Sequence, residues 1–392
     1  MSTVVQSSSI DNFFNHMNVS LHVPKPAYQH LSHLLQGMIQ ERRNGSMTVL
    51  RNSSFWQRHL TSVTRFFQYG QWNEQGVQRK LQRSIYQQVQ QMSSSEDPLM
   101  VIIDDSICPK TKPSSQALEP TEGASYHFDH KQGKPIYAHQ WVTTMIGTRG
   151  SFLPFAMTPY VKEEYSKLDM ARHHMDQIPD GTRDVYVLTD SWYAATSLMA
   201  YIQERGWHFI GGLKSNRVLL NDRVSQPVRE WAQQKEDQTS CIVTVGDASY
   251  YVHRYDGALK GGLKGTVLAC RPTNTAASES AVRYFFCTDS SLTAQKILHF
   301  YAERWNIETF FQEIKDKLHM GDYRLRSLFA IKRYMLVLQL AYTFIMQHYQ
   351  QGFSTGYWRA NKERRRSLLF YVYQKAQKGV SLQSLEKELM IA

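Results

Sequence analysis

The stretch FYAERWNIETFFQEIKDKL, residues 300–318, decides how the rest of this chain is interpreted. Its spacing predicts one long helix from Thr293 to Leu318, with an apolar face that packs on a sheet. At about 100° per residue, four polar side chains of this helix fall within about 60° of one another. They are Tyr301, Arg304, Glu308 and Lys315. The alternative is a solvated face with ion pairs between residues four apart.

Two apolar strand patterns upstream each end in an aspartate. LMVIID (99–104) ends at Asp104, and DVYVLTD (184–190) ends at Asp190. Because α/β folds place their sites at the carboxyl ends of strands, both acids are candidate site residues. An aspartate after a strand is also a common turn or helix-capping residue. Asp105 directly follows Asp104, which leaves open which of the two faces the site.

The order of strand and helix patterns around these two strands indicates an α/β fold with a mixed sheet. Further strand patterns occur at 136–147, 151–161 and 207–214, and helical patterns at 166–178 and 194–206. Strands and helices that alternate in this way are typical of a sheet covered by helices.

We predict four regions along the chain. The first is helical, because apolar residues recur at three- and four-residue steps. The α/β domain is interrupted by a run of strands without a long helix, an all-β insertion. A helical tail ends the chain. The regions are 1–95 (helical), 96–214 with 291–350 (α/β), 215–290 (insertion) and 351–392 (tail).

The charge of the chain favours a polyanionic partner. The 392 residues carry a formal net charge of +11, and the pI is near 9.3. Residues 1–95 hold nine Lys and Arg against three Asp and Glu. The four cysteines form no CxxC pair, which fits reduced cytosolic thiols. The start of the chain resembles no signal peptide, and the apolar run 334–346 is too short to span a bilayer, so we expect no membrane partner.

The spacing Tyr301-x₂-Arg304-x₃-Glu308-x₆-Lys315 matches the YREK signature of bacterial insertion-sequence DDE transposases of the insertion-sequence-four type. IIDDS (102–106) resembles the first-Asp strand of that family, where Ser or Thr follows one residue after the Asp, and this pattern favours Asp104 over Asp105. LTDSWYAA (188–195) resembles the second-Asp strand, although Trp192 stands where many members have Gly. FIGGLKSNR (209–217) is similar to the strand before the family's β insertion. The resemblance covers about residues 99–320.

The resemblance implies a ribonuclease H-like fold and a two-metal site for Mg²⁺ or Mn²⁺. Asp104 would bridge the ions, and Asp190 and Glu308 would each hold one. Three side chains would grip DNA beside the scissile bond, through phosphates or a base: Arg304, Lys315 and Tyr301.

The implied activity is cut-and-paste transposition, in which cleavage at the element ends precedes strand transfer into target DNA. Lys214 and Arg217 follow a strand near the site, and we hypothesise that they contact the DNA backbone; the alternative is ordinary surface charge. The implied partners are the terminal inverted repeats, recognised by the N-terminal helices, and the target DNA. A homodimer on DNA is also implied, and the implied compartment is the bacterial cytoplasm, at the nucleoid.

Two other functions remain open from the sequence. A ribonuclease H-like nuclease without strand transfer would share the carboxylates. A decayed, non-catalytic DNA-binding relative of a transposase would tolerate the loss of an acid, and the presence of all three acids argues against it. Among the tryptophans, we expect Trp305 to lie in the core, and Trp231 is a candidate support for a flipped base.

Overall fold

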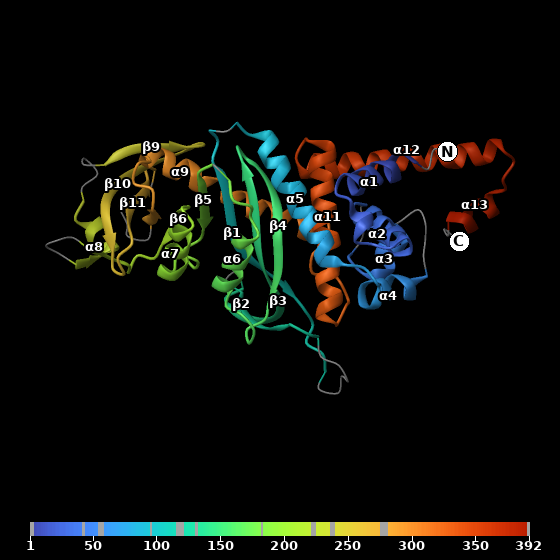
Figure 1. The fold of residues 1–392 in the computed structure, drawn as a ribbon, viewed down its shortest axis with the longest axis horizontal. Helices are drawn as coiled ribbons and strands as arrows, with labels where there is room; N and C mark the ends of the chain where they lie inside the picture. Colours follow the sequence, from blue (N-terminus) through green and yellow to red (C-terminus); the bar gives the residue numbers. More distant parts are fainter. Residues whose placement is uncertain are drawn as a thin grey trace.

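The computed structural model describes residues 4–40, 44–53, 59–94, 96–114, 121–129, 132–181, 183–220, 225–235, 240–274 and 281–389. The molecule is elongated, with a β-rich part at one end, a tall sheet at the centre and helices at the other end (Figure 1). Three arginines of the basic N-terminal set lie outside the described residues: Arg42, Arg43 and Arg58.

The central part of the sheet forms from the predicted apolar runs. Its strands are β1 (Leu99–Pro109), β2 (Ser125–Asp129), β3 (Lys134–Thr148), β4 (Ser151–Tyr160), β5 (Val185–Thr189) and β6 (His208–Leu213). The strand order is β2-β3-β1-β5-β6, and β4 also pairs with β3. β1, β5 and β6 are parallel, whereas β3 is antiparallel to β1 and β4. The expected mixed sheet is therefore present.

Helices cover this sheet and connect its parallel strands. α6 (Lys167–Asp176) begins at Ser166, whose hydroxyl accepts a hydrogen bond from Asp169 N, and it packs on β3. α7 (Thr196–Glu204) joins β5 to β6 and packs on β6. A helix between parallel neighbours is the usual crossover connection, and it leaves the carboxyl ends of β1 and β5 at one edge of the sheet.

Residues 218–287 extend the same sheet. The strands are β7 (Val218–Leu220), β8 (Ser225–Pro227), β9 (Cys241–Val245), β10 (Ala248–Leu259), β11 (Lys264–Pro272) and β12 (Arg283–Cys287). β12 pairs with β6, and the order continues β12-β11-β10-β7-β8, with β9 on β10.

The expectation of an all-β insertion needs a correction, because α8 (Val228–Gln233) lies within this segment. The helix buries Trp231, which is 6% exposed and meets the ring of Tyr255 edge-on at 5.7 Å. Burial against β10 makes Trp231 a core residue, so its indole is not available to a DNA base.

The predicted single helix over 293–318 is in fact two, α9 (Ala294–Ala302) and α10 (Trp305–Asp316). At the junction, Glu303 N and Arg304 N donate to carbonyls three residues back, in the manner of a 3₁₀ turn. The side chain of Asn306 donates to Glu303 O and thereby competes for a helical acceptor. Glu303 and Arg304 keep helical φ and ψ, so the polar stripe survives the break.

The N-terminal region is helical, as its spacing predicts. Its helices are α1 (Val4–His16), α2 (Lys25–Met38), α3 (Met47–Ser53), α4 (Leu60–Tyr69) and α5 (Glu74–Met92). The C-terminal helices are α11 (Leu328–Tyr349), α12 (Phe353–Gln377) and α13 (Leu382–Leu389). α1, α2, α4 and α5 pack on α11, and α5 also lies across β3 and β4. The N-terminal helices thus share a core with the C-terminal region.

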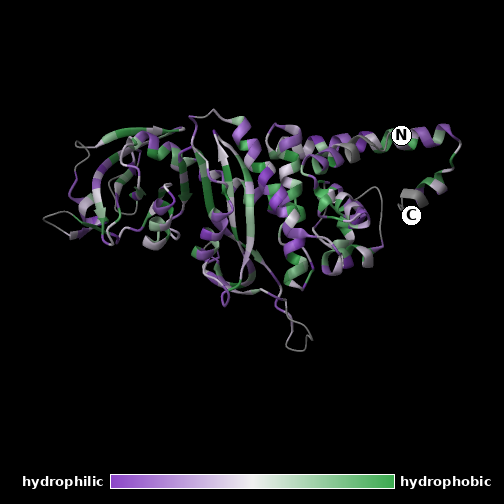
Figure 2. Cartoon of the chain, in the orientation of Figure 1, coloured by the Kyte–Doolittle hydropathy of each residue, from purple (hydrophilic) through white to green (hydrophobic). Residues whose placement is uncertain are grey.

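α11 is the spine of the helical end. Figure 2 shows the hydrophobic colour gathered on this helix and on the central strands. Among the described residues, it is the one helix long and apolar enough to cross a membrane, but 83% of its most apolar window is buried inside the protein. Core packing accounts for its composition.

Arg333 of α11 ties this spine to the N-terminal helices. Its guanidinium, 4% exposed, donates to the carbonyls of Gly70 at 2.8 Å and Trp72 at 3.2 Å, and pairs with Glu74 at 3.0 Å. The carbonyls of Phe66 and Phe67 lie 3.4 Å away. One cation therefore provides hydrogen-bond donors for the backbone carbonyls at the end of α4 and pairs with Glu74 at the start of α5.

Replacement of Arg333 by leucine should lower the free energy of unfolding by about 3 kcal/mol, because buried carbonyls and Glu74 lose their partner. Arg359→Leu is the matched control, since the Arg359–Glu363 pair is largely exposed at 52% and 41%. Urea unfolding followed by circular dichroism measures both. Equal, small losses in the two variants would contradict the role given to Arg333.

Candidate active site

Asp104 and Asp190 lie side by side. The expectation that a strand ends at Asp104 needs a correction, because β1 continues to Pro109 in its pairing with β3; only Asp190 directly follows the end of its strand. Ile103 of β1 is in register with Thr189 of β5, so Asp104 and Asp190 follow at equivalent points of parallel neighbours, about 4.8 Å apart along the hydrogen-bonding direction. Oδ1 of Asp190 accepts hydrogen bonds from Trp192 N at 2.9 Å and, more weakly, from Tyr193 N at 3.3 Å. The turn after β5 therefore fixes this carboxylate.

Asp104 stands in an environment that opposes its ionisation. Burial and the neighbouring Asp190 raise the pKa of Asp104 from 3.8 to about 7. A hydrogen bond from Asp105 N to Oδ1 at 2.7 Å and the charge of Arg304 act in the opposite direction without offsetting the rise. Two neighbouring carboxylates with little access to water are destabilised when both are ionised, and a nearby positive charge would stabilise them.

Arg304 supplies that charge. Its Nη1 lies 3.2 Å from Oδ2 of Asp104, and its Nη2 donates to Oε1 of Glu308. The Arg304 side chain is 13% exposed and bridges β1 to α10. Glu308, which looks unpaired in the sequence, is thus paired four residues back along the helix. Arg304 therefore joins the polar stripe to Asp104, which lies beside Asp190.

The three carboxylates do not form a ready-made metal cage. Within the described residues, no three His, Cys, Asp or Glu side chains are grouped closely enough to hold a metal ion. The donor chemistry nevertheless fits a hard divalent cation, because all three side chains offer carboxylate oxygens. The raised pKa of Asp104 shows that its negative charge is poorly stabilised, and a bound cation would stabilise it. Arg304 occupies the space between Asp104 and Glu308 and neutralises the same acids that a cation would.

Asp105 faces the other way. Successive side chains of a strand point to opposite faces, and Asp105 contacts Lys167, Tyr193 and Gln140 behind the sheet. Asp104 is therefore the residue that faces Asp190 and Arg304, in agreement with the preference from the sequence pattern.

The other residues of the stripe flank this cluster. Lys315 Nζ donates to Ser106 Oγ at 2.6 Å, and Ser106 shares a face of β1 with Asp104. Tyr301 packs on Phe285 of β12, with ring centroids 4.6 Å apart, and the Arg304 guanidinium lies 5.7 Å from its ring. Burial raises the pKa of Tyr301, so its hydroxyl remains a donor.

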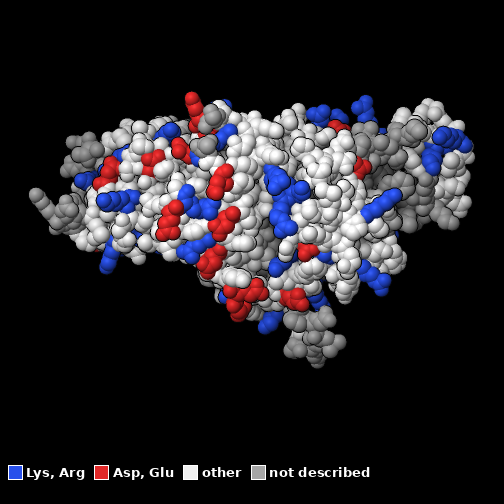
Figure 3. Space-filling view, viewed as in Figure 1, with Lys and Arg blue, Asp and Glu red and all other residues white. Residues whose placement is uncertain are grey.

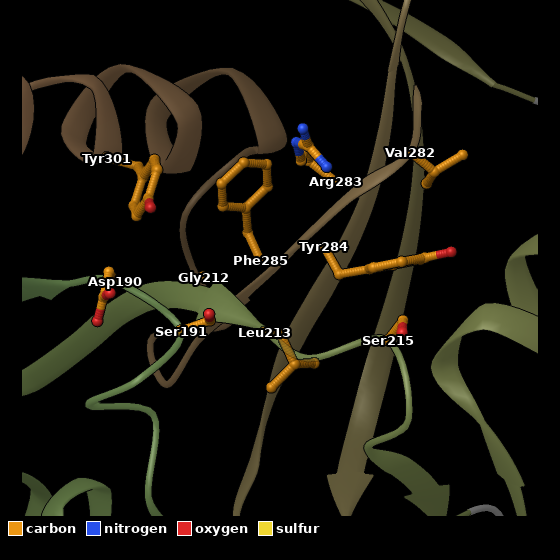
Figure 4. Close-up of a pocket in the computed structure, with 10 residues that line it drawn as sticks. All are labelled: Asp190, Ser191, Gly212, Leu213, Ser215, Val282, Arg283, Tyr284, Phe285 and Tyr301. Carbon is orange, nitrogen blue, oxygen red and sulfur yellow. The ribbon is translucent and has the colours of Figure 1, made fainter. Parts of the chain in front are cut away.

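A cavity of about 700 Å³ opens beside Asp190, between β6, β12 and α9. In Figure 4, Asp190 and Tyr301 lie at one end of this cavity, near Phe285, and Arg283 lies further along it. Its lining residues are Asp190, Ser191, Gly212, Leu213, Ser215, Val282, Arg283, Tyr284, Phe285 and Tyr301. The sequence gives no sign of Arg283 and Phe285 as site residues, because only the pairing of β12 with β6 brings them there.

The structure places three further residues that the sequence singles out. Lys214 is exposed directly after β6. Arg217 donates to Thr196 Oγ1 at 3.1 Å, at the start of α7. The expectation that Trp305 lies in the core is wrong: it is 65% exposed, because it precedes the buried Ile307 by two residues, about 200° around the helix.

Asp104→Asn should stabilise the metal-free protein at about pH 8 and have little effect at about pH 4. The folded pKa of about 7 exceeds the ordinary value of 3.8, so stability is full below pH 3.8 and is lost as the pH rises toward 7. Asparagine has no charge to bury. We expect a melting temperature roughly 5 °C above wild type at the higher pH, by calorimetry with a chelator present. The same difference at both pH values would refute the burial of a charged Asp104.

Comparison with known protein families identifies the family of this chain. The family model described as transposase DDE domain matches residues 95–344, a segment that includes β1, β5, α10 and most of α11. No curated protein matches the chain. Because the matched segment spans well over half of the sequence, the chain belongs to the transposase DDE domain family, whose members are enzymes that act on DNA.

Proposed function

We propose that this transposase cuts DNA at the ends of a mobile element and joins those ends to target DNA, with Mg²⁺ or Mn²⁺ as cofactor. The observation that carries the proposal is that one guanidinium joins Asp104 to Glu308, while Asp190 lies beside Asp104 on the neighbouring parallel strand. The order β4-β3-β1-β5-β6, with β5 and β6 parallel to β1, supports a ribonuclease H-like catalytic domain.

Asp104, Asp190 and Glu308 are the residues that would hold the cations. When bound, divalent cations activate the attacking water or 3′-hydroxyl and offset charge on the leaving oxygen. The protein contributes a fixed orientation. The turn after β5 holds Asp190, the Asp105 amide holds Asp104, and α10 presents Glu308 from the opposite side.

Arg304 has two alternative partners in this account. In the free protein it neutralises Asp104 and Glu308. A DNA phosphate could accept two hydrogen bonds from the guanidinium. If Arg304 turned from the acids to such a phosphate, Asp104 and Glu308 would become free to bind cations. Lys315, held by Ser106, would meet phosphate further along the same stripe, and Tyr301 would donate to phosphate or contact a base. DNA binding would thereby prepare the acid site.

Basic side chains at two places on the surface are candidates for DNA contact. Arg283 lines the cavity next to Asp190, which would receive a nucleotide adjoining the cut, and the exposed Lys214 stands in the sequence between the lining residues Leu213 and Ser215. Figure 3 shows a row of Lys and Arg over α5, a helix that carries the exposed Arg79 and Arg83. We propose that the N-terminal helices recognise the terminal inverted repeats, that two copies act together on DNA, and that the protein works at the bacterial nucleoid.

Asp104→Asn, Asp190→Asn and Glu308→Gln should each reduce cleavage of element-end DNA by more than roughly a hundredfold, since even the partners behind metal ligands are worth about 10- to 100-fold. Each variant should still bind the ends. Asp316→Asn, an exposed acid on the same helix as Glu308, is the control and should cleave normally. A Glu308→Gln protein that still cleaves would remove this residue from the site. Pre-cleaved ends that are never joined to target DNA would reduce the activity to that of a nuclease.

Arg304→Gln should bind Mn²⁺ more tightly than wild type when no DNA is present, by roughly 10-fold, and should cleave DNA more slowly. The first effect follows from the loss of an internal competitor and the second from the loss of a phosphate contact. Electron paramagnetic resonance of free Mn²⁺ measures the affinity. Arg254→Gln, which removes the Arg254–Asp256 pair in the insertion, is the control. Unchanged or weaker Mn²⁺ binding would refute the double role of Arg304.

A further inference from the structure

A buried polar network lies behind the two aspartates, on the face of β1 opposite Asp104. Asp105 is its centre: Oδ1 accepts from Lys167 Nζ at 2.9 Å and from the Tyr193 hydroxyl at 3.0 Å, and Oδ2 accepts from Gln140 Nε2. Gln140 belongs to β3, Lys167 opens α6, and Tyr193 lies in the turn after β5. One carboxylate therefore joins four separate segments.

Tyr193 connects this network to Asp190. Its backbone N is one of the two donors to Oδ1 of Asp190, at 3.3 Å, while its hydroxyl bonds to Asp105. The side chain is completely buried. The network also contacts the other donor residue, because Lys167 Nζ lies 4.7 Å from the ring of Trp192. A shift of the Tyr193 ring would move the turn that fixes Asp190.

The composition of this network is not the one that stability alone favours. The side chains of Asp105 and Lys167 are only 17% and 13% exposed, and removing an ion pair from water costs about as much as the pair returns. Apolar residues could fill the same space. The polar network instead fixes the orientation of its side chains, because each hydrogen bond holds a particular donor and acceptor in place. Burial keeps the pKa of Tyr193 well above 10, so the phenol always donates to Asp105.

We propose that Asp105 and Tyr193 are positioning residues, which set where the Asp190 carboxylate stands relative to Asp104 without contacting substrate or cation. The inference rests on the proposed function, because it gives these residues a purpose in the same site. It assigns the two members of the Asp104–Asp105 pair to different tasks on the two faces of one strand.

Tyr193→Phe is the sharpest test, because it removes one hydroxyl and leaves Asp105 with Lys167 and Gln140. We expect Mn²⁺ affinity, by electron paramagnetic resonance, to fall roughly 10-fold, with the same rise in the Mg²⁺ concentration for half-maximal cleavage. Cleavage at saturating metal should recover to near wild type. Asp105→Asn should also lower the Mn²⁺ affinity. This second variant keeps the shape of the side chain, so its effect cannot come from a change of volume in the network.

Tyr186→Phe is the matched control, since Tyr186 of β5 donates to Asp289 at 2.7 Å in a comparable Tyr–Asp bond away from the site. It should change thermal stability but leave the metal dependence unaltered. If Tyr193→Phe lowered only the melting temperature, as this control does, the positioning role would be overturned. If Asp105→Asn abolished Mn²⁺ binding as completely as Asp104→Asn, Asp105 would be a ligand and the proposal would also fail. A wild-type protein without metal-dependent cleavage would overturn the proposed function itself.

Discussion

The parallel pairing of β1 with β5 is the constraint on which the site depends. Asp104 lies within β1 and Asp190 directly follows β5, and the register of the two strands brings these aspartates to neighbouring positions. Burial and, to a lesser extent, the charge of Asp190 raise the pKa of Asp104. The fold accepts this cost because β1 and β5 are held from both sides, by β3 and by β6. The pairing of the backbone strands therefore fixes the two carboxylates close together.

In the free protein, the Arg304 guanidinium supplies positive charge next to Asp104. The break between α9 and α10 places it at the N-terminal end of α10, four residues before Glu308, from where it reaches Asp104 in β1. A side-chain cation can leave, whereas a sheet register cannot change. The chain thus combines fixed acids with a movable counter-charge, an arrangement suited to a site that handles the phosphates of DNA. The network around Asp105 adds rigidity on the opposite face.

Much of this site could be predicted from the sequence, because local pattern governs it. Apolar runs that end in aspartate gave Asp104 and Asp190 their places, and a helical period placed Glu308 beside Arg304. The contact of Arg304 with Asp104, 200 residues apart, could not be predicted, since it depends on how α10 crosses β1. The same limit applies to Asp105, whose partners come from three distant segments. Trp231 and Trp305 were misjudged because their burial depends on tertiary packing.

The most direct test of this account is to locate Mn²⁺ by anomalous diffraction in crystals of the protein bound to element-end DNA. We expect Mn²⁺ to be held by Asp104, Asp190 and Glu308, with the Arg304 guanidinium turned away from the acids and onto a DNA phosphate. Manganese bound by Asp105, or an Arg304 that still bridges Asp104 and Glu308 with no Mn²⁺ beside them, would contradict the account.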